Sequence, residues 1–508
     1  MLGLTQNTLV NDQKKTEVAC MKKLWTMILA VALMAALAVT GIAQGAVKVS
    51  GISDMGIYHQ LVALIVEYDQ EVAAPDADAY VVADFASAYM KEEYDRADIG
   101  MGKITAVYTN DTNDRREDKT SVPGKYVVIE LEPVSGSFFS EENGVQTVNN
   151  PAGYCTWRLA GESCEWRRND FSALVVSQKK NIVNANGDVV AKAGVLPTLQ
   201  PEDIRHLKIE DFVTTTMKNP QGYDIHYSLS VPKNYDATKK YPLVVSVSGN
   251  GGRINYKQQD ADGNFLCVGG NLGRDSAAAA WLECDEDIII LTPQPWRDQP
   301  EEWGIDIVAD TIQLIDTVMA EYSIDTERVY AVGSSFGTMH LSSVIKRRPD
   351  IFTAYAQCNG MWMLGNDATS PESGSVNIYT DEFEGKVVGW NCTDALSLPE
   401  REDCFKEKDE YWAEATAALQ GVVDNRIPVY FWHGVNDGSI SWTRALSPYY
   451  VLQAMYEEAG LTQAEIDELV KLYFADDEEY YENGICEIHA TSKLAVSYPW
   501  FRDWMLAQ

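Results

Sequence analysis

The sequence predicts two folded domains, an all-β domain followed by an α/β domain. The chain has 508 residues, of which 46% are hydrophobic, so it is globular and longer than one ordinary domain. Residues 47–197 contain short segments of alternating apolar and polar residues, which are typical of strands. From about residue 198 onward, apolar runs lead into glycine-containing turns and helix-compatible stretches, which are typical of an α/β fold.

Residues 1–46 precede both domains and have the features of a secretory signal. Lysines at positions 22 and 23 come before an apolar run at 24–39, and small residues follow at positions 43 and 45. The run is short for a membrane span, so cleavage is favoured over a retained anchor. Met21 begins a proper signal and is the expected true start. We therefore expect a secreted protein, extracellular or periplasmic, without membrane attachment after cleavage.

Residues 47–197 are expected to form a β-sandwich. Alternating segments run over 61–68, 103–108 and 125–131, and Asn186-Gly187 is a strong signal for a two-residue hairpin turn. The region contains no nucleophile motif and no charge cluster. A packing or oligomerisation module that partly covers a site in the second domain is therefore favoured over a separate carbohydrate-binding function.

The α/β domain, residues 198–508, has a strongly apolar segment at 241–247 that predicts an early strand. The segment leads into Ser-Gly-Asn-Gly-Gly at 248–252, where glycines let the backbone approach a bound group. A phosphate-binding loop is the alternative, but the lysine and Ser/Thr of that motif are absent. We expect this loop to offer the backbone N–H of Asn250 to a ligand oxygen.

A Gly-Ser-Ser-Phe-Gly sequence at 333–337 follows the apolar segment 328–332 and precedes a helix-compatible stretch. A strand, a tight G-x-S-x-G turn and a helix together predict the nucleophile elbow of an α/β-hydrolase, with Ser335 at its apex. The flanking residues must be small because the backbone is strained there. The backbone amides of Phe336 and Asn250 are the expected oxyanion hole for the tetrahedral intermediate.

The partners of Ser335 are expected downstream, because the order in this fold is Ser, then Asp or Glu, then His. The segment 428–434 predicts a buried strand, and the polar loop after it contains Asp437, the natural acid. His489 is the only histidine after Asp437, so its assignment as general base is nearly forced. Asp437 would hold the tautomer of the His489 imidazole. His433 precedes the acid and is interpreted as structural.

From about residue 224 to its end, the chain resembles the polyhydroxybutyrate depolymerase-like and feruloyl esterase-like branch of the α/β-hydrolases. The features that carry the resemblance, in order, are Val-Pro-Lys-Asn-Tyr-Asp at 231–236, Pro-Gln at 293–294 with Trp296 and Trp303, Ile-Asp-Thr-Glu-Arg-Val-Tyr at 324–330, the elbow, Arg-Pro-Asp-Ile-Phe at 348–352, His-Gly-Val-Asn-Asp at 433–437 and His489. The β-rich region resembles the immunoglobulin-like domain found in front of some esterases of this family. The resemblance implies an α/β-hydrolase catalytic domain preceded by an all-β immunoglobulin-like sandwich.

The activity that the resemblance implies is hydrolysis of carboxylic esters, with short-acyl or plant cell-wall aromatic esters as candidate substrates. Two positions depart from the family's pattern. Ser248 stands where members usually carry histidine, which alters how the oxyanion loop is braced. Thr338 stands where glycine is frequent and fills space at the start of the elbow helix. Neither change removes a reacting group.

Residues 361–425 exceed a minimal hydrolase and are expected to form an insertion over the C-terminal edge of the sheet. The segment is rich in tryptophan. These residues would suit a lid or a wall of an acyl pocket, and they would equally suit an ordinary small hydrophobic core. The candidate pocket residues are Trp296, Trp303 and Trp390.

Eight cysteines remain after removal of the signal, and an even number in an exported chain suggests disulfides. Buried free thiols are the alternative, and no cysteine pair forms a C-x-x-C zinc pattern. Spacing favours the pairs Cys155–Cys164, Cys267–Cys284, Cys392–Cys404 and Cys358–Cys486, with other connectivities open.

The charge balance is 41 basic against 75 acidic residues, a net charge of −34, which argues against nucleic acid and anionic membranes as partners. Neutral substrates are expected, as a small-molecule or polysaccharide-linked ester. Asp-Ala-Asp-Gly-Asn at 260–264 hints at a calcium loop, but its glycine is one position early and no glutamate closes the motif. We expect no metal and no cofactor. A serine peptidase of the same fold and a non-catalytic binding protein stay open as alternatives, as does a homo-oligomer.

Overall fold

The protein is described here by a computed structural model. It describes residues 45–55, 59–84, 101–132, 138–142, 145–149, 157–160, 163–166, 174–200, 203–255, 277–297, 299–365, 375–376, 387–388, 405–406, 408–483, 488–489 and 491–508. Contacts divide the chain into two compact units, Met1–Asp54 with His59–Leu207, and Met55–Tyr58 with Lys208–Gln508. The apolar run and proposed cleavage positions of the expected signal lie largely outside the described residues.

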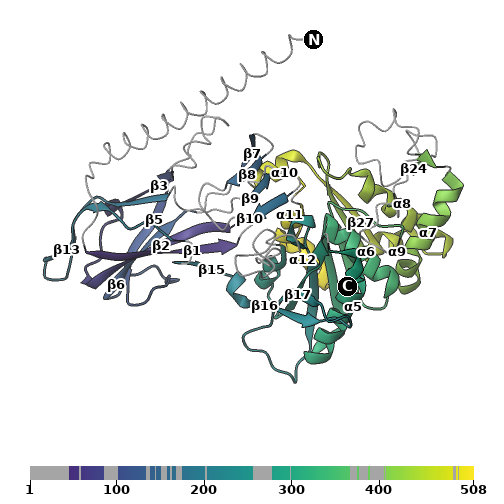
Figure 1. The fold of residues 1–508 in the computed structure, drawn as a ribbon, viewed down its shortest axis with the longest axis horizontal. Coiled ribbons are helices and arrows are strands. Elements are labelled where there is room, and N and C mark those ends of the chain that lie inside the picture. Colours follow the sequence, from purple (N-terminus) through teal and green to yellow (C-terminus); the bar gives the residue numbers. More distant parts are fainter. Residues whose placement is uncertain are drawn as a thin grey trace, which may run out of the picture. The chain divides into compact units, whose positions relative to one another are not determined.

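The first unit is built of strands (Figure 1). One sheet has the order β15(Ile204–His206), β1(Ala46–Met55), β2(His59–Val72), β6(Gly124–Leu131), β5(Ile104–Asn110), and a second has the order β14(Gly194–Val195), β11(Leu174–Gln178), β3(Tyr80–Asp84), β4(Met101–Gly102). A further sheet has the order β10(Ser163–Trp166), β9(Trp157–Ala160), β8(Val145–Asn149), β7(Phe138–Glu142). Val66 and Ile129 of the first sheet share one apolar core with Val82 and Val176 of the second, so the predicted sandwich is confirmed.

The three predicted alternating segments fall within β2, β5 and β6. The hairpin around Asn186-Gly187 is present between β12(Ile182–Val183) and β13(Val189–Ala191), but the prediction of a two-residue turn is wrong. Asn184 N donates to Asp188 O (2.9 Å), which encloses residues 185–187. The side-chain oxygen of Asn184 also accepts from the backbone amides of Asn186 (2.9 Å) and Asp188 (3.0 Å). Gly187 N also donates to Asn184 O (3.0 Å) with Gly187 at φ +86°, so the turn contains three residues, and the Asn184 side chain adds two further hydrogen bonds to it.

The second unit contains an eight-stranded sheet. Its order is β16(Phe212–Lys218), β17(Asp224–Ser230), β20(Ile289–Gln294), β18(Tyr241–Val247), β22(Ile324–Ser334), β23(Ala354–Cys358), β26(Val429–Gly434), β27(Val470–Ala475). Strands from β20 to β27 pair in parallel, whereas β16 and β17 are antiparallel to their neighbours. The carboxyl ends of the parallel strands thus meet at one edge of the sheet.

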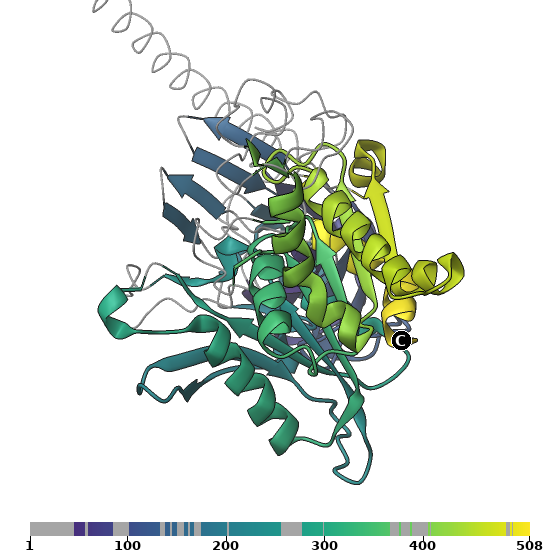
Figure 2. The ribbon, with the colours of Figure 1, turned by 90° about the vertical axis from the view of Figure 1, so that its right-hand side faces the viewer.

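Helices cover both faces of this sheet (Figure 2). Successive strand residues alternate between two cores, with Val245 on one side and Val244 on the other, which explains why the strands are continuously apolar. The first core packs against α5(Ile307–Glu321), α6(Phe336–Arg347), α7(Lys408–Asn425), α8(Thr443–Glu458) and α9(Gln463–Leu469). The second packs against α4(Ala277–Ala280), α10(Asp477–Glu482), α11(Thr491–Ser497) and α12(Pro499–Leu506). The predicted α/β domain is confirmed.

The segment expected to be an insertion, 361–425, is described at 361–365, 375–376, 387–388, 405–406 and 408–425. Residues 408–425 form α7, which packs on the sheet as the connection to β26. Trp362 is fully buried, and its indole N–H donates to Ala418 O on α7 (3.1 Å). Helix α7 and the segment around Trp362 therefore belong to the core of the unit. Short strands β24(Val387–Val388) and β25(Phe405–Lys406) pair within the segment.

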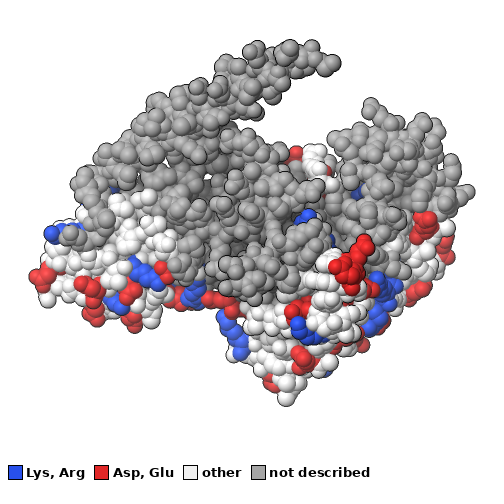
Figure 3. Space-filling view, viewed as in Figure 1, with Lys and Arg blue, Asp and Glu red and all other residues white. Residues whose placement is uncertain are grey.

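Of the disulfides expected from spacing, the structure tests the Cys267–Cys284 pair. Cys284 carries a free thiol, so this disulfide is not formed. Cys358 is buried at the end of β23, and its expected partner Cys486 lies outside the described residues. The pairs Cys155–Cys164 and Cys392–Cys404 also lie outside the described residues, except for the backbone of Cys164. None of the described helices combines the length and apolar character needed to cross a bilayer. On the face drawn in Figure 3, described acidic and basic side chains are interspersed.

Candidate active site

Ser335 occupies the sharp turn between β22 and α6. Its backbone has φ +51° and ψ −118°, an unusual conformation for a residue with a side chain. A Cβ at Gly337 would lie 1.9 Å from Val247 O, and one at Gly333 would lie 2.7 Å from Thr338 N. Glycine is therefore required at both positions, at Gly337 because the turn packs directly on the end of β18 and at Gly333 because the start of α6 packs back on it. Ser335 N donates to Cys358 O (3.1 Å), which ties the turn to the end of β23.

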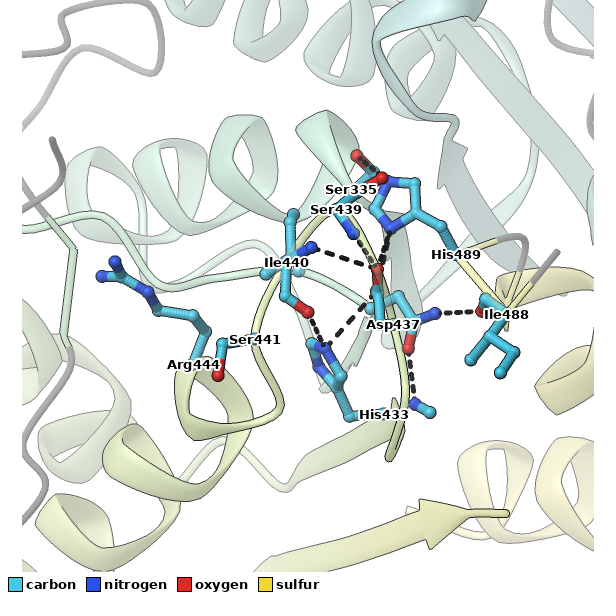
Figure 4. A network of polar contacts seen from close by, with 12 residues as sticks. Ser335, His433, Asp437, Ser439, Ile440, Ser441, Arg444, Ile488 and His489 are labelled. Carbon is cyan, nitrogen blue, oxygen red and sulfur yellow. Dashed lines mark hydrogen bonds and ion pairs between the residues drawn. The ribbon is translucent and has the colours of Figure 1, made fainter. Parts of the chain in front are cut away.

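The structure brings Ser335, His489 and Asp437 together from three separate loops (Figure 4). His489 Nε2 lies 2.9 Å from Ser335 Oγ, and His489 Nδ1 lies 2.8 Å from Asp437 Oδ2. An ionised carboxylate only accepts hydrogen bonds, so Nδ1 carries the proton and Nε2 is free to accept one from the Ser335 hydroxyl. A non-catalytic binding protein would be favoured if these side chains lay beyond hydrogen-bond distance. The observed distances do not favour it.

Asp437 is held by backbone and side-chain donors. Its side chain is 0% exposed, and its Oδ1 accepts from the backbone amides of Ser439 (2.8 Å) and Ile440 (3.0 Å). Burial alone would raise the pKa of this carboxyl, but hydrogen bonds from His433 and His489 outweigh it and hold the pKa well below its usual value. Asp437 therefore stays ionised beside the imidazole of His489.

His433 contacts the same carboxylate from the other side (Figure 4). It is completely buried, with Nε2 2.9 Å from Ile440 O and 3.5 Å from Asp437 Oδ2. Because Ile440 O can only accept, Nε2 carries the proton. Sequence reasoning interpreted His433 as structural and missed its contact with Asp437, although the four-residue spacing between the two was visible.

Asn359 links the segments that precede Asp437 and His489 and was missed by sequence reasoning. It follows β23, is fully buried and has a positive φ of 42°. Its Nδ2 donates to Ile488 O (2.5 Å), its Oδ1 accepts from Gly434 N (2.8 Å), and its backbone N–H donates to Trp432 O (2.9 Å). Asn359 therefore connects the strand before Asp437 to the residue before His489. The polar pair Asn-Gly at the end of an apolar strand was the available signal.

The expected oxyanion-hole residues lie on two segments beside Ser335. A Cβ at Gly249 would lie 3.3 Å from Ser335 Cβ, so the glycine-rich loop approaches the nucleophile closely. Asn250 begins the short 3-10 turn Asn250–Gly252, and Phe336 is the first residue of α6. Within the part of the chain that the structure describes, neither backbone N–H donates to another group. Both amides can therefore bind an oxygen atom.

The two departures from the family's pattern are accommodated locally. Thr338 Oγ1 donates to Ser335 O (2.6 Å) and accepts from Met361 N (2.9 Å), so it ties the elbow to the loop after β23. A Cβ at Gly360 would lie 1.9 Å from Thr338 Oγ1, so glycine opposite makes room for the threonine. Ser248 is buried, and its hydroxyl lies 3.4 Å from Gly249 O, where it donates a long hydrogen bond.

The candidate pocket tryptophans have different surroundings. Trp296 is 3% exposed and donates its indole N–H to Asp224 O (2.7 Å). It is therefore too buried to line a pocket directly and can affect one only by supporting neighbouring residues. Trp303 is half-buried, stacks on Tyr223 (4.8 Å between ring centroids) and meets Trp296 edge to face (5.7 Å). Trp390 and the 260–264 segment lie outside the described residues. Among the described side chains, no His, Cys, Asp or Glu group is arranged to hold a metal ion.

Comparisons with known proteins match both units. Residues 56–191 match the family described as "Esterase Ig-like N-terminal domain", and residues 294–438 match the "Prolyl oligopeptidase family". A bifunctional acetylxylan esterase/xylanase from Neocallimastix patriciarum is 29% identical over 147 residues, which cover 28% of this chain and 19% of that protein. The match thus spans about a fifth of that relative's length.

Two solved structures are similar to this chain. A thermostable esterase superposes over 91% of this chain and 99% of its own, with a TM-score of 0.56 and 18% identity. An acetyl xylan esterase from Aspergillus awamori covers 52% of this chain and 92% of its own, with a TM-score of 0.35 and 18% identity. The first of these confirms the overall fold. The chain thus combines an esterase-type immunoglobulin-like N-terminal domain with a serine hydrolase domain of the α/β-hydrolase fold.

Proposed function

We propose that the protein is a secreted serine carboxylesterase that forms an acyl-enzyme on Ser335. The observation that carries the proposal is the continuous hydrogen-bonded chain from Ser335 Oγ through His489 to Asp437, with contacts of 2.9 and 2.8 Å. The fold and the esterase-type N-terminal domain support the same class of reaction. Residues 47–197 and 198–508 are the proposed domains, with export directed by the segment before them.

In the acylation step, Ser335 Oγ attacks the ester carbonyl carbon while its proton passes to His489 Nε2. The carbonyl oxygen becomes an oxyanion, which the backbone amides of Phe336 and Asn250 bind. Asp437 stabilises the imidazolium that forms. When the tetrahedral intermediate collapses, the bond to the alcohol oxygen breaks and His489 returns the proton to that oxygen.

Deacylation repeats the sequence with water. His489 takes a proton from water as the water oxygen attacks the acyl carbon, and the same two amides bind the second oxyanion. Collapse breaks the bond to Ser335 Oγ, which regains a proton from His489. The products are a carboxylic acid and the free enzyme, and no cofactor is needed for the balance.

Neutral short-acyl or aromatic, feruloyl-type esters are the proposed substrates. The net charge of −34 disfavours anionic substrates over a long range. The partly exposed stack of Trp303 on Tyr223 offers an aromatic surface at the edge of the sheet where β17 begins. A screen of aryl esters of graded acyl length, with methyl ferulate, tests the class. Activity on none of them, with Ser335 intact and the protein folded, would overturn the proposal.

A serine peptidase is the second candidate, because residues 294–438 match the prolyl oligopeptidase family. The same three side chains would serve amide hydrolysis, so geometry at Ser335 does not separate the two. Peptide anilides and aryl esters with the same acyl group provide the comparison. Hydrolysis of the anilides alone would favour the peptidase, and hydrolysis of the esters alone would favour the esterase.

A further inference from the structure

The side chain of Arg253 contacts residues from both segments that flank Ser335. Its Nη1 donates to Asn250 Oδ1 (3.2 Å), and its guanidinium carbon lies 4.0 Å from the centroid of the Phe336 ring. Its Nη2 also donates to the backbone oxygen of Trp296. A single side chain thus touches the two residues whose backbone amides are the expected oxyanion-hole donors.

We propose that Arg253 is a positioning residue that fixes the two halves of the oxyanion hole relative to one another. This inference rests on the proposed function, because the oxyanion hole matters only for a reaction at Ser335. The two halves come from different parts of the chain, the loop after β18 and the first turn of α6. Arg253 forms a side-chain bridge between them.

The loop that carries Asn250 needs such a bridge. It contains glycine at positions 249, 251 and 252, and a Cβ at Gly249 would make a tight contact of 3.3 Å with Ser335 Cβ, so this loop offers few side chains for packing. Glycine gives the backbone conformational freedom that side-chain packing does not restrict. The Asn250 side chain is therefore the group through which this turn can be fixed, and Arg253 fixes it by a hydrogen bond.

Both ends of the bridge are anchored. Ile254, the residue after Arg253, is buried, donates its backbone N–H to Pro295 O (3.1 Å) and pairs with Trp296 in a short ladder. On the other side, the Phe336 ring stacks against the ring of His340 (5.7 Å), and His340 Nε2 lies 2.8 Å from Thr311 Oγ1. The guanidinium therefore lies between two elements whose own positions are fixed by packing.

The chemistry of the bridge requires arginine. A guanidinium is planar, so it donates hydrogen bonds in its plane while its face stacks on an aromatic ring. A lysine ammonium is a point charge with a different reach and cannot make both contacts in the same way. Lysine is therefore expected to restore the charge without restoring the alignment of the two amides.

The test uses the full chain with Arg253→Met and Arg253→Lys, and Arg328→Met as the matched control. Arg328 lies on β22, pairs with Glu286 and is outside the proposed site. Each variant is assayed for kcat and KM on an aryl ester, for inhibition by an arylboronic acid, and for thermal unfolding. The boronic acid forms a tetrahedral adduct with a serine and so reports on the oxyanion hole.

We expect Arg253→Met to lower kcat about 10- to 100-fold, less than the loss of an oxyanion donor itself, with KM changed less than about threefold. The inhibition constant of the boronic acid should rise by a similar factor. Arg253→Lys should recover little of the loss, and Arg328→Met should keep the wild-type kcat. A rise in KM alone, or an unchanged boronic acid constant, would overturn the inference.

Asn250→Ala provides a second test that keeps Arg253 and the Asn250 backbone amide. If Arg253 acts through the Asn250 side chain, this variant should show part of the same loss in kcat, and the double variant should lose less than the product of the two single losses. Fully multiplicative losses would contradict the inference. Failure of the proposed function is recognised separately, because then the wild-type protein would neither hydrolyse esters nor react with an organophosphate at Ser335.

Discussion

Two buried carboxylates, one in each unit, lie in contrasting surroundings. Glu130 on β6 is 1% exposed and accepts hydrogen bonds from the Tyr108 hydroxyl (2.8 Å) and from Arg115 Nη2 (2.6 Å). The side chain of Asp437 is equally buried at 0% exposure, but its side-chain partners are the imidazoles of His433 and His489. Both carboxylates are satisfied, and only the second has a partner that can take up a proton.

The difference in partners decides what each carboxylate does. The guanidinium of Arg115 keeps its charge at all relevant pH values and neutralises Glu130, and this hydrogen bond raises the pKa of Arg115 further. In the proposed mechanism, the imidazole of His489 takes up the serine proton during the reaction, so the charge of Asp437 would serve the reaction as well as the fold. A buried carboxylate beside a fixed cation indicates stability, and one beside an imidazole in reach of a serine indicates catalysis.

The largest expected effect is that of Asp437→Asn. The amide preserves the shape of the side chain but favours the wrong tautomer of His489, so kcat should fall about 10³- to 10⁴-fold with the fold retained. Ester hydrolysis and circular dichroism measure the two quantities. An Asp437→Asn variant with nearly full activity would break the distinction between the two carboxylates.

A smaller loss is expected for Asn359→Asp. The new carboxylate oxygen would face Ile488 O in place of the donor Nδ2 and displace His489, which should lower kcat about 10- to 100-fold with little change in KM. Asn184→Asp, at the hairpin of the first unit, is the control and should leave kcat unchanged. Equal activity of the two variants would show that Asn359 does not position His489.

Glu130→Gln should affect stability and leave the chemistry intact. It leaves Arg115 without its countercharge, and because Arg115 is 30% exposed the cost should be about 2 kcal/mol, below the range for a fully buried pair. Urea unfolding measures the change, and kcat on the same ester should match the wild type. A loss of kcat without a loss of stability would mean that the N-terminal network contributes to catalysis.

The sequence was sufficient to predict that Ser335, Asp437 and His489 come together, because the elbow, the strand end and the last histidine each have a local pattern. It did not predict Asn359 or Arg253, since their roles depend on contacts between segments far apart in the chain. The turn at 185–187 was mispredicted for a different, local reason, because hydrogen bonds among residues 184–188 enclose three residues where two were expected. The free thiol of Cys284 likewise depends on packing that spacing does not encode.

The smallest expected effect is on the stability of the protein at acidic pH. The folded-state pKa of Asp437 is lower than in the unfolded chain, so this group adds stability above pH of about 4, and that stability is lost as the pH falls through the lowered pKa. Urea unfolding at pH 5 and at pH 3 should therefore show a shallower loss for Asp437→Asn than for the wild type. Equal losses would mean that the contacts with His433 and His489 do not stabilise the ionised form.

Covalent labelling of Ser335 tests the central claim most directly. The wild-type protein treated with an organophosphate should carry a single label, and mass spectrometry should locate it on Ser335. Ser335→Ala should prevent the labelling and lower kcat at least about a thousandfold with the fold intact, whereas Ser334→Ala should still be labelled at Ser335. A label on Ser334 or on another serine, or ester hydrolysis that survives in Ser335→Ala, would contradict the account.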